Sequence, residues 1–108
     1  MDPDRARELL NAERRRIERA LARLGHQDTG EEADDQDPGN LATDLYQDEL
    51  DEGLADDLRE ELAAVDRAEA RLAAGTYGLS VESGEPIPEE RLEAIPTAER
   101  TTEEEARR

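Results

Sequence analysis

Apolar residues recur at helical spacing in two long stretches of the chain. In the first stretch, Leu10, Ile17 and Leu24 lie seven residues apart, and Ala6, Ala20 and Leu21 widen the stripe. In the second stretch, the apolar positions are spaced by three and four: Leu54, Leu58, Leu62, Val65, Ala68 and Leu72. Each pattern places an apolar stripe along one side of a helix. We therefore predict two amphipathic helices that pack antiparallel.

Helix-terminating residues set the ends of these helices. The first helix is expected to begin at Pro3, which suits a first helical position, and to end near Gly25. The second is expected over residues 41–74, because Gly75 is a stop signal. Residues 25–40 hold three glycines, one proline and almost no apolar side chain, which predicts a loop at the far end of the hairpin.

The sequence after Gly75 predicts a compact knuckle with Gly and Pro turns. Residues 89–94 predict a short helical turn, and residues 101–106 predict a helix start. Thr101 and Glu104 have the spacing of a capping box. The expected core of this region is small: Leu79, Val81, Ile87, Leu92 and Ile95.

Charge is strongly segregated along the chain. The formal net charge is −17, from 31 acidic and 14 basic residues. From Leu24 to Leu58 there is no Lys or Arg, so the far end of the predicted hairpin is an acidic pole. Such a charge argues against nonspecific nucleic-acid binding and against anionic membrane surfaces. It favours a partner with a basic surface.

Composition narrows the class of protein further. A chain of 108 residues suits one small domain, and two tyrosines without Phe or Trp favour a slender helical object. The absence of cysteine excludes disulfides, and a charged N-terminus with no long apolar run predicts a cytoplasmic protein. Every Lys or Arg position holds arginine. A GC-rich genome or a salt-adapted proteome would each produce that bias.

Enzyme chemistry has little support in the sequence. His26 is the single histidine and lies in the predicted loop, and there is no cysteine nucleophile or Gly-rich phosphate loop. An EF-hand starting at Asp35 fails, because Asn40 stands at position six and Tyr46 at position twelve. We therefore expect a binding protein and no enzyme.

Three runs in the knuckle carry a family resemblance. They are Gly-Thr-Tyr-Gly at 75–78, Ser-Gly-Glu-Pro-Ile-Pro at 83–88 and Arg-Leu-Glu-Ala-Ile-Pro-Thr-Ala at 91–98. The chain resembles the DksA/TraR family of bacterial transcription regulators. The resemblance implies a mostly α fold: a long antiparallel two-helix coiled-coil hairpin over residues 1–74, and a small zinc-ribbon-like region with a short C-terminal helix over 75–108. Family members bind RNA polymerase directly, through its secondary channel, without touching DNA.

The positions that correspond to the family's zinc ligands hold no cysteine. Neutral hydroxyls are poor zinc ligands, and one carboxylate cannot hold a structural site alone. We expect a degenerate, zinc-free knuckle with no cofactor. Some relatives act with the alarmone ppGpp, but that site does not carry over residue by residue and stays open. The relic metal positions are Ser80, Ser83, Thr101 and Glu104.

The resemblance also places the tip of the hairpin. The family's tip has an Asp-Pro pair followed shortly by a second acidic residue, and here Asp37 and Pro38 are followed by Asn40. Asp37 is therefore the leading partner-binding residue, with Asp34, Asp35 and Asp44 as possible substitutes. A solvated acidic loop without a partner is the competing interpretation.

Together these observations predict a monomeric transcription regulator that binds RNA polymerase through its acidic tip, without direct nucleic-acid or membrane contact. Two alternatives remain open. The chain could be an acidic helical scaffold or decoy for another basic protein, or an inactive member that keeps the fold alone.

Overall fold

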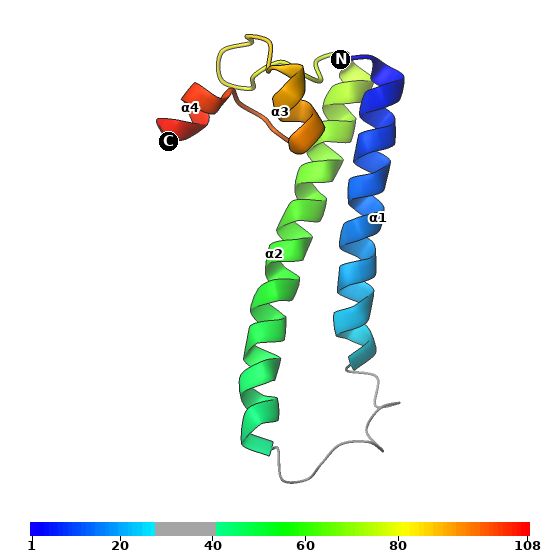
Figure 1. Ribbon diagram of the computed structural model, residues 1–108, viewed down its shortest axis with the longest axis vertical. Helices are drawn as coiled ribbons and strands as arrows, with labels where there is room; N and C mark the ends of the chain where they lie inside the picture. Colours follow the sequence, from blue (N-terminus) through cyan, green and yellow to red (C-terminus); the bar gives the residue numbers. More distant parts are fainter. Residues whose placement is uncertain (28–40) are drawn as a thin grey trace. The chain divides into compact units, whose positions relative to one another are not determined.

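The computed structural model describes the backbone of residues 1–27 and 41–108, and the side chains of residues 1–24 and 51–108. The helices are α1 (Pro3–Gln27), α2 (Leu41–Ala74), α3 (Glu89–Ala94) and α4 (Thr102–Ala106) (Figure 1). By contacts, the chain forms two compact units. Unit 1 comprises Met1–Arg15 and Ala63–Arg108, and unit 2 comprises Arg16–Leu62. The predicted mostly α fold with a long antiparallel helix pair is confirmed. The boundary expected between residues 74 and 75 stays a prediction.

The predicted helix ends agree closely with the structure. α1 begins at Pro3 and ends at Gln27, two residues beyond Gly25, because a single glycine costs a helix about 1 kcal/mol and need not end it. α2 ends before Gly75, which adopts a positive φ of 80°. The N–H of Thr76 donates to the carbonyl of Arg71 at 2.9 Å, and the N–H of Gly75 donates to the carbonyl of Leu72 at 3.2 Å. This hydrogen-bond pattern is a Schellman motif, which ends the helix.

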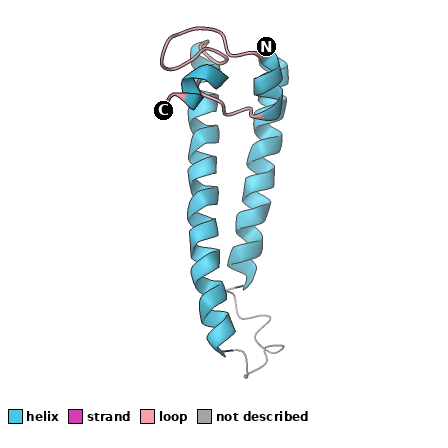
Figure 2. Ribbon diagram, turned by 60° about the vertical axis from the view of Figure 1, so that its left-hand side comes forward, coloured by secondary structure: helices cyan, strands magenta, loops and turns pink. Residues whose placement is uncertain are grey.

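In unit 1, the first turns of α1 lie beside the last turns of α2 (Figure 2). Ala6 and Leu10 of α1 are fully buried, as are Val65 and Ala68 of α2. The small alanines allow the two backbones to approach closely, and the larger side chains fill the remaining space.

Among the described side chains of unit 2, the buried apolar residues are Ile17 of α1 and Ala55 and Leu58 of α2. The prediction that Leu54 belongs to the stripe is wrong, because its side chain is 50% exposed. Continuing the spacing of three and four back from Leu62 leads to Leu58 and Ala55. A residue one position earlier is turned about 100° around the helix axis and faces away.

Unit 1 contains a second apolar cluster, beside the helix pair. It consists of Ile87, Leu92 and Ala98, with Met1 and Tyr77 packed against it. The Tyr77 hydroxyl donates to a backbone carbonyl, that of Pro96, at 2.8 Å. The cluster fixes α3 against the segment that leads into α4.

The predicted core of the knuckle is only partly right. Ile87 and Leu92 are buried, but Leu79, Val81 and Ile95 are 39%, 48% and 45% exposed. Leu79 and Val81 flank the buried Ser80. In an extended segment, successive side chains point to opposite sides, so a buried Ser80 turns both neighbours outward.

Two ion-pair groups connect the helices of unit 1 to its C-terminal part. Arg5 of α1 donates to both carboxylate oxygens of Glu93 on α3 at 3.0–3.2 Å. Arg67 and Arg71 of α2 both reach Glu99 at 3.2 Å. Over the part of the chain that the structure describes, no helix combines the length and apolarity of a membrane span.

Candidate functional site

Within the knuckle, residues 78–87 form a tight hairpin in unit 1. The Ser80 N–H donates to the Glu85 carbonyl at 2.8 Å, and the Gly84 N–H donates to the Ser80 carbonyl at 2.9 Å. Gly84 holds a φ of 77°, a left-handed conformation that non-glycine residues rarely adopt. The turn directs the Ser80 side chain inward, where it is 4% exposed.

Thr101 and Glu104 form the start of α4. The Glu104 N–H donates to Thr101 Oγ1 at 3.2 Å, and the Thr101 N–H donates to Glu104 Oε1 at 2.9 Å. This is the predicted capping box, which the structure confirms. The N–H of Val81 donates to the carbonyl of Glu99 at 2.8 Å, so the segment before α4 runs along the knuckle.

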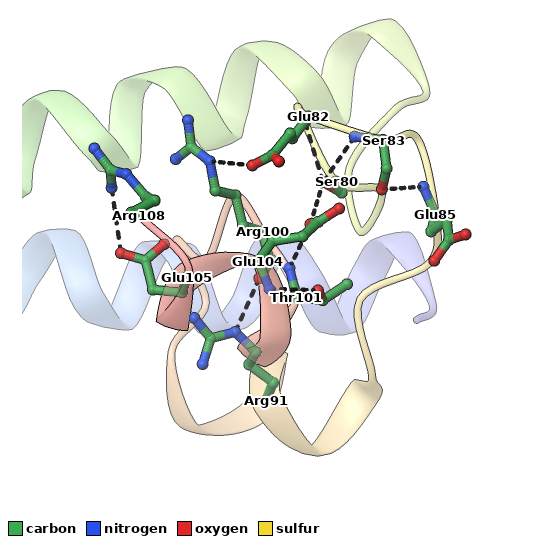
Figure 3. A network of polar contacts seen from close by, with 10 residues as sticks. All are labelled: Ser80, Glu82, Ser83, Glu85, Arg91, Arg100, Thr101, Glu104, Glu105 and Arg108. Carbon is green, nitrogen blue, oxygen red and sulfur yellow. Dashed lines mark hydrogen bonds and ion pairs between the residues drawn. The ribbon is translucent and has the colours of Figure 1, made fainter.

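The relic metal positions meet at the knuckle (Figure 3). The Ser80 hydroxyl donates to Glu104 Oε1 at 2.6 Å. In turn, the N–H groups of Glu82 and Ser83 donate to Ser80 Oγ at 3.0 and 3.2 Å. Ser80, Thr101 and Glu104 are 4%, 8% and 5% exposed. The structure thus gathers all four predicted positions into one hydrogen-bonded centre.

The centre is built to hold a negative charge. The hydroxyl of Ser80, then that of Ser83, and the backbone of Thr101 lower the pKa of Glu104 to about 2. Hydrogen bonds that favour the charged form of a carboxyl group have this effect, and here they outweigh the opposing effect of burial. Glu104 is therefore a carboxylate at any physiological pH.

These residues do not fit a structural zinc ion. Three of the four donors are neutral hydroxyls, whereas structural zinc takes thiolate and imidazole ligands. Two ligand atoms of a tetrahedral zinc lie about 3.3 Å apart, given bond lengths of about 2.0 Å. Ser80 Oγ and Glu104 Oε1 lie only 2.6 Å apart, because the Ser80 hydroxyl donates a hydrogen bond to the carboxylate. Within the described ranges, no group of three or more His, Cys, Asp or Glu residues could hold a metal.

A second polar centre, around Glu99, was not predicted from the sequence. Burial alone would raise the pKa of Glu99, but the hydrogen bond and charge of Arg67 and the charges of Arg71 and Arg100 lower it below its usual value. Arg91 Nε donates to the Arg100 carbonyl at 3.0 Å. The sequence offered one signal for it: Glu99 is the single acidic residue between Glu93 and Glu103.

The predicted tip residues fall largely outside the described part of the chain. Asp34, Asp35, Asp37 and Asn40 lie outside the described residues, and Asp44 lies in α2 with a side chain that is not described. Their grouping therefore stays a prediction. In unit 2, the described part of α2 continues the acidic character with Asp51, Glu52, Asp56, Asp57, Glu60 and Glu61.

The fold and the site together define a class of protein: a long helix pair followed by a C-terminal region with the framework of a zinc ribbon. The prokaryotic dksA/traR C4-type zinc finger family matches residues 75–108. The structure of transcription factor DksA2 from Pseudomonas aeruginosa has a TM-score of 0.76 and 32% identity, covering 97% of this chain and 81% of that one. This protein therefore belongs to the DksA/TraR family.

Two curated proteins of Bacillus subtilis strain 168 are also similar. General stress protein 16O is 35% identical over 97 residues, which make up 90% of this chain and 58% of that protein. The uncharacterized protein YteA is 45% identical over 64 residues, 59% of this chain and 27% of YteA. The chain thus spans less than two thirds of the length of either curated relative.

Proposed function

We propose that this protein regulates transcription by binding RNA polymerase, with the acidic far end of its hairpin in the secondary channel. One observation carries the proposal: the fold agrees with transcription factor DksA2 over 97% of this chain, hairpin and C-terminal region together. A shared C-terminal region alone would support common ancestry. A shared hairpin supports a common mode of action, because the hairpin is the part that reaches a partner.

Charge supports a basic partner surface and opposes a nucleic-acid partner. The net charge of −17 repels phosphate backbones and accelerates encounter with a basic channel. We propose that Asp37 approaches the catalytic magnesium or its basic neighbours and alters polymerase conformation, and that Asn40 weakens this effect relative to a tip with two carboxylates. The protein acts as a cytoplasmic monomer of a bacterium, without enzymatic activity.

Crosslinking tests the mode of binding. A photoreactive amino acid at Gln36, beside the tip, should crosslink to polymerase segments that line the secondary channel, and one at Glu90, on α3, should not reach them. Asp37→Asn should abolish most of the effect on transcription from a responsive promoter while changing the dissociation constant by no more than about tenfold. Glu90→Gln removes the same charge from an exposed residue of α3 and should change neither.

Two results would contradict the proposal. One is failure to bind polymerase at low ionic strength, where electrostatic attraction is strongest. The segregation of charge would then favour the second candidate, an acidic scaffold or decoy for another basic protein. The other is an Asp37→Asn variant that binds polymerase and is as active as the parent protein. That result would show that Asp37 does not carry the effect on polymerase.

A further inference from the structure

In a C4-type zinc finger, the metal ion joins two pairs of ligands that are distant in sequence. Here the first pair of positions, Ser80 and Ser83, lies in the knuckle, and the second pair, Thr101 and Glu104, opens α4. The two pairs are joined directly, because the Ser80 hydroxyl donates to Glu104 Oε1 across 24 positions of sequence. The Thr101 N–H donates to the same oxygen at 2.9 Å. One carboxylate oxygen therefore stands where the two pairs meet.

The attachment of α4 depends on this oxygen. α4 has five residues, far fewer than a helix needs to persist alone in water. Its one buried residue is Glu104, so no apolar side chain of α4 is buried against the rest of unit 1. A buried carboxylate is costly unless it accepts hydrogen bonds, and these donors come from the knuckle and the cap. The contact that holds α4 is therefore polar and charged.

The Ser80 side chain is fixed from both sides. It accepts the N–H groups of Glu82 and Ser83 and donates its own proton to Glu104. A hydroxyl in this position has a single direction left for its proton, so the hydroxyl of Ser80 is aimed at Glu104 by the backbone of the knuckle. The Ser80 hydroxyl therefore does not have to reorient to donate to the Glu104 carboxylate.

We propose that Glu104 takes the structural place of the family's metal ion: its carboxylate, with Ser80 and Thr101 as donors, fastens α4 to the knuckle, and this region folds without zinc. The inference does not depend on polymerase binding. It concerns how this chain completes its C-terminal region, and it would stand if the partner proved to be another protein.

Amide hydrogen exchange tests the role of the carboxylate. Ser80→Ala should speed exchange of the Thr101, Glu82 and Ser83 amides by about tenfold or more. The Glu82 and Ser83 amides lose their acceptor, and the Thr101 amide keeps an acceptor, Glu104, that Ser80 no longer holds in place. The α1 and α2 amides should be unchanged. Glu103→Gln removes a charge from an exposed neighbour in α4 and is the matched control, with exchange expected to equal that of the parent protein.

If the C-terminal region of the Ser80→Ala variant does not fold, a second variant tests the proposal. Glu104→Gln keeps an oxygen that can accept from Ser80 and Thr101 but removes the charge. A folded region with faster exchange at Thr101 supports the proposal. Exchange equal to that of the parent protein in either variant overturns it.

Metal analysis of untagged protein provides an independent test. We expect substoichiometric zinc, and a thermal unfolding midpoint that neither EDTA nor added zinc changes. One zinc ion per chain, or a midpoint that falls on chelation, would overturn the proposal regardless of the exchange result.

Discussion

Arg14 of α1 and Glu69 of α2 form an ion pair in which Arg14 Nη2 lies 2.7 Å from Glu69 Oε1. The same nitrogen contacts Asp66. The Arg14 side chain is only 26% exposed, so the pair sits at the edge of the apolar interface of unit 1. A shift of one helix by a turn would leave these charges unpaired. The pair therefore favours one register of the two helices, as polar groups in coiled coils do.

We expect Arg14→Met to destabilise the protein by about 1 kcal/mol, the upper end for an ion pair that stays partly solvated. A double-mutant cycle with Glu69→Gln should give a coupling free energy of about 0.5–1 kcal/mol in urea unfolding at low salt, and less at high salt. Arg19→Met, at an exposed position of α1, is the control. A coupling free energy near zero would show that this ion pair does not select the register of α1 against α2.

Leu54 and Leu58 should differ strongly although they have the same side chain on the same helix. Leu58→Ala should destabilise the protein by about 2–4 kcal/mol, because the 5% exposed side chain leaves a cavity. Leu54→Ala should change the free energy of unfolding by less than about 0.5 kcal/mol. Denaturant midpoints at a fixed pH measure both. Equal effects would place Leu54 in the interface after all.

Gly53, inside α2, and Gly75, directly after its last residue, should respond in opposite ways to replacement by alanine. Gly75→Ala places a Cβ on a residue with φ of 80°. It should destabilise by about 1 kcal/mol through the backbone alone, since no described atom beyond the adjacent residues would lie within 4 Å of that Cβ. Gly53→Ala, inside α2 and equally unobstructed, should stabilise by up to about 1 kcal/mol. Thermal unfolding should therefore shift in opposite directions.

The Glu104 carboxylate should make unfolding depend on pH in the acidic range. Its pKa is about 2 in the folded protein and 4.5 ordinarily, so the folded state favours the charged form. This stabilisation is fully present above about pH 4.5 and is lost as the pH falls towards about 2. The difference in unfolding free energy between the parent protein and Glu104→Gln should shrink over that window.

Restoring cysteine at the relic metal positions should restore metal binding. The four side chains already converge, so a variant with Ser80→Cys, Ser83→Cys, Thr101→Cys and Glu104→Cys should bind one zinc or cobalt ion in a tetrahedral thiolate site. Cobalt absorbance reports that geometry. A variant with Glu103→Cys in place of Glu104→Cys keeps the cysteine count but points one thiol outward, and should bind much more weakly.

Helix periodicity and stop signals were sufficient to predict most of the fold. Pro3 and Gly75 act through their own backbone restrictions, which depend on no distant residue, so helix ends could be found locally. Leu54 failed because a spacing of three or four leaves two adjacent positions equally acceptable. Only packing against α1 chooses Ala55 instead.

The candidate site was predicted as a set of positions, but its chemistry was not. The spacing of Thr101 and Glu104 was enough to expect a capping box. That Glu104 would also accept from Ser80 could not be predicted, since it requires the knuckle and α4 to meet across 24 residues. Glu99 was missed for the same reason, because its arginine partners in α2 lie about 30 residues earlier.

The contact between Arg5 and Glu93 spans 88 positions of the chain. During synthesis, Arg5 leaves the ribosome long before Glu93 exists, so this contact cannot form until translation has passed residue 93. Contacts between residues so distant in sequence slow folding, because the chain has to close before the contact can stabilise it. A nascent chain that stalls before Val65 and Ala68 have emerged would leave Ala6 and Leu10 without their partners in α2, until translation resumed or a chaperone covered them.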